Sequence, residues 1–255
     1  TNQNPSVQKV HDLFVAGGET VENDHIAFRT FNDPRVNVDV LAKPFIKAGY
    51  EEKNEYQFEA KKLYAKHFEH KSDPKAPRVF ISQLKLEEFS DFLQETVRKL
   101  IDQIPEELLK SDELIYSGNV WGTPSYETYQ RLRDESEYAA WLYVYGFCAN
   151  HFTVSINHLE KFDSIQKVNS FLKENGFHMN DSGGEIKGTP EQLLEQSSIK
   201  SEIIPVDFDE GSFEIPGCYY EFARRYPDQD GRLYSGFIAK SADKIFESTD
   251  YYKKG

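Results

Sequence analysis

The sequence predicts an α+β fold made of two related βαβββ modules, with helices inserted between them. Two stretches resemble each other: residues 24–31 read Asp-His-Ile-Ala-Phe-Arg-Thr-Phe, and residues 150–156 read Asn-His-Phe-Thr-Val-Ser-Ile. Each is followed by an apolar segment with helical spacing that ends at a glycine, Gly49 or Gly176. Aromatic residues make up 14% of the chain and methionine occurs once, which favours a β-rich interior.

The first half of the chain alternates helical and strand-like patterns. Apolar residues recur at helical spacing before Gly17, and again between the turn at 32–34 and Gly49. Alternation with a period of two marks the strands between them. The expected elements are, in order, a helix within 5–20, a strand at 25–31, a helix at 38–46, strand structure over 55–70 and a strand beginning at 79–81.

A long helical region separates the two related stretches, with helical patterns at 85–109 and 126–147. The second module is then expected to contain a strand at 151–157, a helix at 165–172, and strands at 199–208 and 217–226. We therefore expect one domain over residues 1–255. Its parts would be a first module at about 21–84, a helical insertion at about 85–147, a second module at about 148–235 and a closing segment at 236–255.

Charge and cysteine content exclude several classes of protein. The formal net charge of −13 argues against a nucleic-acid-binding protein, which needs a concentrated basic surface. Two cysteines, Cys148 and Cys218, cannot form the disulfide framework of a small secreted domain, and they match no zinc motif. No apolar run reaches the length of a membrane span and no signal peptide is recognised, so we expect a cytoplasmic protein without a membrane partner.

His25 and His151 occupy equivalent positions in the two related stretches, and two imidazoles can hold a divalent transition metal between paired modules. A third, anionic ligand is expected. Glu221 is the best candidate because it is an acid within an apolar, aromatic strand. A buried carboxylate is costly unless it is paired, protonated or bound to a metal. The alternative is an ion pair of Glu221 with Arg224 or Arg225.

Two histidines and one carboxylate leave about three coordination positions open, which is the arrangement of non-haem Fe(II) oxygenases. A 2-oxo acid can chelate the ion through two of these positions, and O₂ can take the third. Arg29 lies four residues after His25 on the same strand face, about 13 Å along the strand at ~3.3 Å per residue. We expect its guanidinium to bind the far carboxylate of a short dicarboxylate. The alternative is an ion pair with Asp24 or Asp33.

These motifs resemble the 2-oxoadipate dioxygenase/decarboxylase family, which is related to the vicinal oxygen chelate superfamily of paired βαβββ modules. The resemblance spans roughly 21–249 and is carried by residues 24–31, 150–153 and 220–222. It implies a curved mixed sheet around a metal site, with His25, His151 and Glu221 as metal ligands. Arg29 would be the catalytic residue that binds the substrate carboxylate, and the substrate would also lie against His25 and His151.

The resemblance also implies a reaction. Members of the family convert 2-oxoadipate and O₂ at an Fe(II) centre into 2-hydroxyglutarate and CO₂, so the implied cofactor is Fe(II), with zinc, nickel or manganese as alternatives in purified protein. The implied partners are a small 2-oxo acid and O₂. The chain looks shorter than the enzymes known for this activity, so substrate contacts after Glu221 are not carried over.

Two other functions stay open. Paired modules of this kind also host Zn(II)- or Ni(II)-dependent hydrolases and glyoxalase-type isomerases, whose activity does not need oxygen. A non-catalytic protein that binds a metal or a small molecule would instead close its site with a fourth ligand, such as His158 or Asp24. His67 and His70 form a His-x-x-His pair, but the Lys- and Glu-rich run around them indicates a solvated edge of the sheet.

Overall fold

The computed structural model describes residues 5–239, 241 and 244, and these fall into two compact units. The first unit contains the described residues up to Ile26, together with His151–Ile204 and the described residues from Ile215 onward. The second unit contains Ala27–Asn150 and Pro205–Glu214. Both units combine helices with β-strands, which confirms the predicted α+β class.

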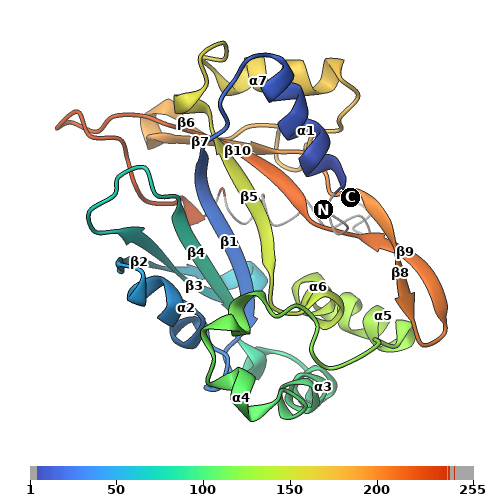
Figure 1. The fold of residues 1–255 in the computed structure, drawn as a ribbon. Helices are drawn as coiled ribbons and strands as arrows, with labels where there is room; N and C mark the ends of the chain where they lie inside the picture. The colour runs from blue at the N-terminus through green and yellow to red at the C-terminus, as the bar shows by residue number, and fades with distance from the viewer. Residues whose placement is uncertain (1–4, 240, 242–243, 245–255) are drawn as a thin grey trace. The chain divides into compact units, whose positions relative to one another are not determined.

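The first unit contains a mixed sheet (Figure 1). Its hydrogen-bonded order is the first part of β1 (Asn23–Phe31), β5 (Ala149–Ser155), β10 (Tyr219–Arg225), β7 (Leu194–Ser198) and β6 (Lys187–Thr189). Strand β10 runs parallel to β5 and antiparallel to β7. Two strands that are distant in the sequence, β5 and β10, therefore lie side by side in this unit.

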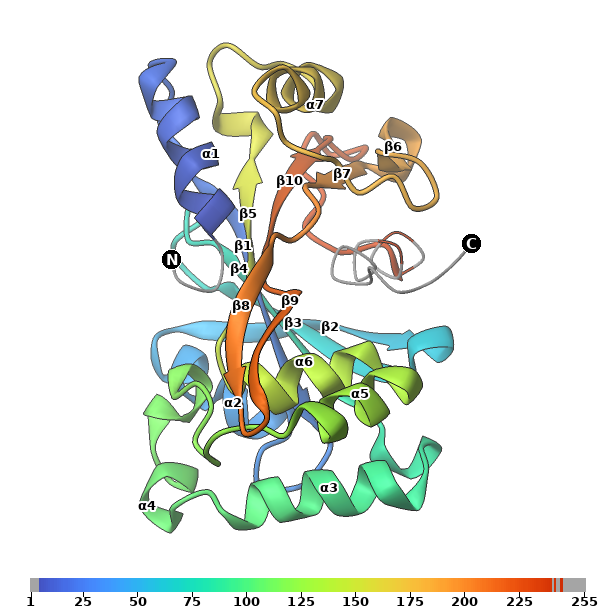
Figure 2. The same ribbon diagram turned by 90° about the vertical axis from the view of Figure 1, so that its right-hand side faces the viewer.

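Helices α1 (Pro5–Ala16) and α7 (Ile165–Glu174) pack against these strands through a buried apolar cluster (Figure 2). Helix α1 ends at Ala16, just before the predicted stop at Gly17 and Gly18. Gly18 adopts the left-handed backbone conformation (φ 85°), which residues other than glycine rarely adopt. Helix α7 begins at the side chain of Ser164, which accepts a hydrogen bond from the backbone of Lys167. The cluster joins these helices to Val154, Tyr220 and Phe222 of the sheet, among others.

The strand residues that pack under the helices determine which residues lie on the other face of the sheet. Successive side chains of a strand point to opposite sides, so Val154 and Phe222 face the helices while Thr153 and Glu221 face away from them. This orientation of the strands is favoured because it buries the apolar side chains under the helices, which contributes roughly 25 cal/mol per Å² of apolar surface. The polar residues between the apolar ones are thereby brought together on the other side of the sheet.

The second unit contains the rest of β1 with β4 (Arg78–Leu84), β3 (Leu63–His70) and β2 (Tyr50–Phe58), paired in that order. Helix α2 (Val38–Lys47) agrees with the predicted helix at 38–46. The strand structure expected over 55–70 is confirmed at 55–58 and 63–70 but is interrupted between these ranges. The short helix η1 (Glu59–Lys61) and the left-handed Lys62 (φ 56°) reverse the chain, and β2 and β3 pair as antiparallel neighbours.

The predicted helical insertion contains α3 (Asp91–Asp102), α4 (Glu106–Leu109), α5 (Tyr126–Glu135) and α6 (Glu137–Tyr145), with short helices η2 (Leu86–Glu88) and η3 (Asp112–Tyr116). Ser136 interrupts the helical pattern over 126–147 because it caps α6 at the point where α5 ends.

A two-stranded sheet of β8 (Ile203–Phe208) and β9 (Gly211–Pro216) lies beside α5, and the rings of Phe213 and Tyr126 stack at 3.7 Å. The sequence prediction missed β6, β7 and β9, and it placed the start of β8 at residue 199 rather than 203. Short helices η4 (Ile156–His158) and η5 (Pro190–Gln192) complete the described elements. Most of the predicted closing segment at 236–255 lies outside the described residues.

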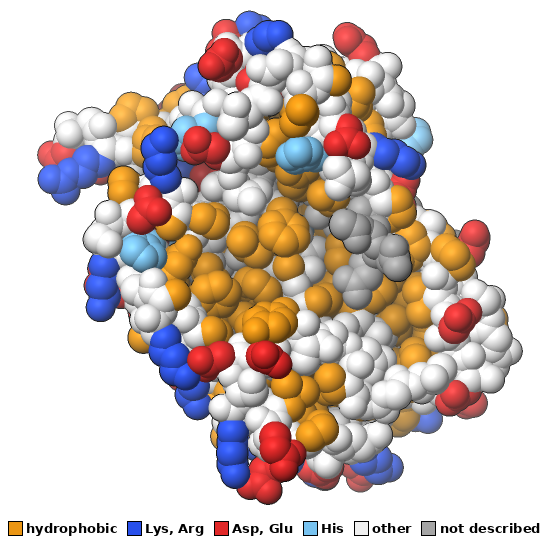
Figure 3. Space-filling view, in the orientation of Figure 1, with side chains coloured by type: hydrophobic (Ala, Val, Ile, Leu, Met, Phe, Trp, Pro, Cys, Tyr) orange, Lys and Arg blue, Asp and Glu red, His pale blue; other side chains and the backbone are white. Residues whose placement is uncertain are grey.

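Surface charge is mixed on the face drawn in Figure 3, where Lys and Arg side chains are interspersed with Asp and Glu. Among residues 5–239, 241 and 244, no helix is both long enough and apolar enough to cross a bilayer.

Candidate metal centre

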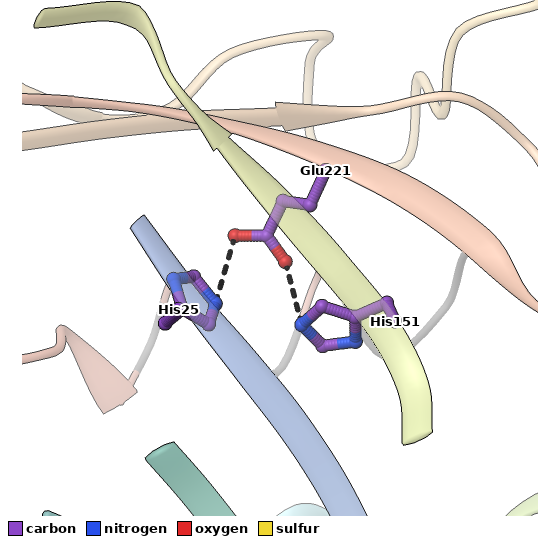
Figure 4. A group of neighbouring side chains, drawn as sticks. All are labelled: His25, His151 and Glu221. Atoms are coloured by element: carbon purple, nitrogen blue, oxygen red, sulfur yellow. Dashed lines mark ion pairs between the residues drawn. The ribbon is translucent and has the colours of Figure 1, made fainter. Parts of the chain in front are cut away.

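His25, His151 and Glu221 converge inside the first unit (Figure 4). One ligand atom from each lies within 4.8 Å of the other two, and all three side chains are buried. His25 Nε2 is 3.6 Å from Glu221 Oε1, and His151 Nε2 is 3.0 Å from Glu221 Oε2. The three residues predicted from the sequence to share a metal are therefore close enough to share one ion.

Strand pairing accounts for the position of Glu221. In the parallel pair of β5 and β10, Tyr219 is in register with His151 and Glu221 with Thr153. Residues two apart on a strand share a face, so His151 and Glu221 lie diagonally across the same side of the pair. Tyr219 stacks on the His151 ring at 4.6 Å and limits where that ring can lie.

Glu221 is fully buried and forms ion pairs with both histidines. Gln196 of the neighbouring strand β7 donates a hydrogen bond of 2.5 Å from Nε2 to Glu221 Oε1. Burial opposes ionisation of Glu221, but the charges of His25 and His151 outweigh it and hold the pKa of this carboxyl below its usual value. The carboxylate is therefore ionised at neutral pH, as a metal ligand must be.

The donor set fits a divalent transition metal, because imidazole nitrogens and one carboxylate oxygen are ligands that such ions accept. Glu221 Oε2 supports this fit. It is buried and lies 3.0 Å from His151 Nε2, while Oε1 lies 3.6 Å from His25 Nε2, so the carboxylate faces both imidazole nitrogens. A buried carboxylate is costly unless it is paired with positive charge, which a divalent ion between these atoms would supply. The group could hold a metal ion.

His25 is held by polar neighbours on both ring nitrogens. Its Nε2 lies 3.0 Å from Thr153 Oγ1, and its Nδ1 lies 2.9 Å from Asp24 Oδ2. Asp24 also accepts hydrogen bonds from Arg225 Nε and Nη2, at 2.7 and 2.9 Å. Burial opposes ionisation of Asp24, but Arg225 and His25 hold its pKa well below the usual range.

Arg225, Asp24 and His158 do not have the roles that the alternatives from the sequence would give them. Arg225 pairs with Asp24 rather than with Glu221, and Asp24 is a partner of His25 rather than a fourth member of the ligand group. His158 is not part of that group either: its Nε2 lies 3.4 Å from a Glu22 carboxylate oxygen.

Arg29 belongs to the second unit and is buried, at 1% exposure. Its guanidinium lies 4.9 Å from the centre of the Tyr138 ring and 5.0 Å from that of Trp141, with Glu137 Oε1 at 3.9 Å from Nη1. The alternative partners were Asp24 and Asp33, but Asp33 pairs with Arg35 and Asp24 with Arg225. A role for Arg29 in substrate binding stays a prediction.

One histidine was placed wrongly. His67 is not on a solvated edge but fully buried in β3, between the hydroxyl of Tyr56 and a carboxylate oxygen of Glu69, each at 2.9 Å. The charged residues around it alternate outward along the strand, which made the segment read as exposed. Among the described residues, neither His67 nor His70 belongs to a group that could hold a metal.

Three residues that support the ligand group were missed: Thr153 and Gln196, which contact His25 and Glu221, and Arg225, which contacts Asp24 behind His25. Thr153 and Gln196 are uncharged residues in strands and carry no distinctive spacing. Arg225 was considered only as a partner of Glu221, four residues before it. Their roles depend on pairing between distant strands, which no local pattern reveals.

The fold and the site define an α+β protein with a glyoxalase-like fold and a buried residue group that could hold a metal ion. A protein from Ralstonia eutropha JMP134, described as a candidate member of the glyoxalase superfamily, has the same fold, with a TM-score of 0.73 at 22% identity over 92% of this chain and 80% of that one. This likeness confirms the expected vicinal oxygen chelate-like architecture.

The chain belongs to the 2-oxoadipate dioxygenase/decarboxylase family, whose model matches residues 6–232. The chloroplastic 2-oxoadipate dioxygenase/decarboxylase of Arabidopsis thaliana is 35% identical to it over 97% of this chain and 74% of the relative. The structure of the hydroxyglutarate synthase of Oryza sativa in complex with 2-oxoadipate is similar, with a TM-score of 0.90 and 34% identity over 97% of this chain and 87% of that one. The family resemblance inferred from the sequence is confirmed.

A protein from Shewanella frigidimarina NCIMB 400, described as a candidate hydrolase, is 54% identical over 92% of this chain and 91% of that one. Its structure has a TM-score of 0.86.

Proposed function

We propose that this chain is an Fe(II)-dependent dioxygenase/decarboxylase that converts a short 2-oxo diacid, such as 2-oxoadipate, into the 2-hydroxy acid that is one carbon shorter. The observation that carries the proposal is the buried group of His25, His151 and Glu221 in a member of this enzyme family. The similar rice structure, a hydroxyglutarate synthase, holds 2-oxoadipate, which supports the substrate class.

The reaction balances without a further reductant. 2-Oxoadipate and O₂ together contain the atoms of 2-hydroxyglutarate and CO₂. The bond between the keto carbon and its neighbouring carboxylate breaks, and that carboxylate leaves as CO₂ with its own two oxygens. One oxygen atom of O₂ completes the new carboxylate of 2-hydroxyglutarate and the other becomes its hydroxyl group. Oxidation of the 2-oxo acid supplies the electrons that reduce O₂. A separate 2-oxoglutarate is therefore not consumed.

His25, His151 and Glu221 would hold the ion and leave about three positions for substrate and O₂. When bound, Fe(II) would supply chelation of the 2-oxo acid and one-electron chemistry with O₂. Glu221 contributes negative charge at a fully buried position, and Gln196 fixes one of its oxygens. The burial of all three ligand side chains favours exclusion of bulk water from the reacting atoms.

Arg29 would bind the carboxylate at the far end of the substrate. It lies on the same strand as His25, four residues further along, and its guanidinium is buried against the rings of Tyr138 and Trp141. Stacking of this kind limits the rotamers of an arginine, so less entropy is lost when it binds a carboxylate. The substrate would then lie with its 2-oxo end at His25 and His151.

A second candidate is a Zn(II)- or Ni(II)-dependent hydrolase or isomerase on the same scaffold. The description of the Shewanella frigidimarina relative as a candidate hydrolase favours it. The two candidates differ in their need for oxygen. Hydrolysis or isomerisation would persist under anaerobic conditions, whereas oxidative decarboxylation would stop.

The test is anaerobic reconstitution with Fe(II), followed by O₂ uptake and CO₂ release over a panel of 2-oxo acids of different length, with and without a terminal carboxylate. We expect uptake of O₂ and release of CO₂ in equal amounts, with 2-oxo diacids as the best substrates. An iron-loaded protein that turns over none of them would contradict the proposal. The module boundaries inferred from the repeat, and the cytoplasmic location, stay predictions.

A further inference from the structure

Asp24 lies at the centre of a buried network beside His25. Its carboxylate accepts from His25 Nδ1 and from two nitrogens of Arg225, and the side chains of Asp24 and Arg225 are each 2% exposed. Two parallel hydrogen bonds between a guanidinium and a carboxylate fix direction as well as distance. The network is thus a rigid support for one ring of the candidate metal centre.

The hydrogen bond from Nδ1 determines which nitrogen of His25 can bind a metal. The Asp24 carboxylate accepts two parallel hydrogen bonds from Arg225 and faces Nδ1, so Nδ1 is the nitrogen that keeps its proton when an ion binds and Nε2 is the one that offers its lone pair. Nε2 is the atom that faces Glu221 Oε1 and Thr153 Oγ1. A second carboxylate behind a metal-binding histidine fixes its tautomer and raises its basicity.

Arg225 has a second set of contacts. Its Nη1 donates to the backbone carbonyls of Tyr234 and Gly236, at 2.9 and 2.8 Å. The ring of Phe237, the next residue, meets the His25 ring edge-on at 4.8 Å, and its centre lies 5.2 Å from the Arg225 guanidinium. The segment 234–237 is therefore attached to the same carboxylate that supports His25.

We propose that Asp24 and Arg225 are positioning residues of the metal centre: Asp24 holds His25 with Nε2 toward the ion, and Arg225 holds Asp24 and fastens segment 234–237 against the His25 ring. This inference rests on the proposed function only in that a metal binds to His25. It gives a role to two buried charges that are not metal ligands. It also predicts that metal binding at His25 is coupled to the order of segment 234–237.

The test uses Co(II) as the probe ion in the full-length chain, with Asp24→Asn and Arg225→Lys as variants. Asn keeps the shape of the Asp24 side chain but removes its charge. Lys keeps the charge of Arg225 but lacks the planar guanidinium, which donates to the Asp24 carboxylate and to two backbone carbonyls at once. We expect the dissociation constant for Co(II) to rise by about 10- to 100-fold in each variant. Arg35→Lys is the matched control, because Arg35 also binds an aspartate, Asp33, through Nε and Nη2.

A second measurement needs no variant. Amide hydrogen exchange over residues 234–237 should slow when wild-type protein binds Co(II), and Arg225→Lys should speed exchange there while Arg35→Lys does not. The inference would be overturned if Asp24→Asn bound Co(II) as tightly as wild type. It would also be overturned if the amide exchange rate over residues 234–237 changed neither on Co(II) binding nor in Arg225→Lys. A wild-type chain that binds the ion but oxidises no 2-oxo acid would contradict the proposed function alone.

Discussion

Glu221 and His151 lie on neighbouring parallel strands, two positions apart in register, with Glu221 Oε2 3.0 Å from His151 Nε2. A parallel pair needs a long crossover connection, and here the chain between β5 and β10 includes helix α7. The helix covers one face of the pair, so the polar residues of both strands share the other face. The metal ligands therefore depend on packing on the opposite side of the sheet.

Replacing Glu221 by Gln should weaken metal binding strongly. The amide keeps the size of the side chain but removes the negative charge that faces His25 and His151. We expect a loss of affinity above about 100-fold, because residues that only support ligands already contribute about 10- to 100-fold. Calorimetric titration with Co(II) measures it. Glu195→Gln is the control, since Glu195 is also buried, lies in adjacent β7 and is bonded to Tyr226.

Arg29→Lys should impair substrate binding and leave metal binding intact. A bidentate bond to a carboxylate is lost, and hydrogen bonds to charged groups contribute about 1.5–3 kcal/mol each. We expect KM for a 2-oxo diacid to rise roughly 10- to 100-fold. A 2-oxo acid without the terminal carboxylate should show little change between wild type and variant. Equal effects on both substrates would mean that Arg29 does not bind that carboxylate.

Leu172→Ala should destabilise the protein without altering the chemistry of the ligands. Leu172 is fully buried in α7 and packs in the cluster on the helix-covered face. The free energy of unfolding should fall by about 2–5 kcal/mol, the usual cost of such a cavity. Urea unfolding gives this value, and Co(II) affinity of the folded fraction should stay within a few-fold of wild type. A large loss of affinity at unchanged stability would argue against separate roles for the two faces.

The ion pair of Asp24 and Arg225 predicts how stability depends on pH. The pKa of Asp24 is depressed in the folded protein, since the neighbouring Arg225 and His25 outweigh the effect of burial. A depressed pKa adds stability that is present above the unfolded value, about 3.9, and is lost as pH falls through the folded value. In metal-free protein, wild type should therefore exceed Asp24→Asn in stability most at about pH 6, and the difference should shrink toward about pH 3. A difference that grows on acidification would contradict this account.

Local sequence patterns were sufficient to predict the three candidate metal ligands. The equivalent positions of His25 and His151 could be read from two similar strands, and Glu221 stood out as an acid among aromatic residues. Each of these signals is contained in a few neighbouring residues. The expected pairing of two modules and the need for an anionic third ligand joined the three residues, and the family resemblance implied the same set, although nothing in their spacing requires them to meet.

The rest depends on contacts that local patterns do not contain. Arg225 could be paired with any nearby acid, and only the structure shows that it reaches Asp24 near the other end of the chain. His67 looked exposed because its neighbours in sequence are charged, yet Tyr56 of the paired strand covers it. The turn at residues 59–62 was not predicted because its left-handed position is occupied by Lys62 and not by a glycine, which would have marked it.

The most direct test of the central claim is an anaerobic Fe(II) titration of wild type beside the double variant His25→Ala/His151→Ala. If His25, His151 and Glu221 share one ion, wild type binds one Fe(II) per chain and the double variant binds none at the same concentration, while its folded structure persists by circular dichroism. Undiminished binding of Fe(II) by a folded double variant would contradict the account.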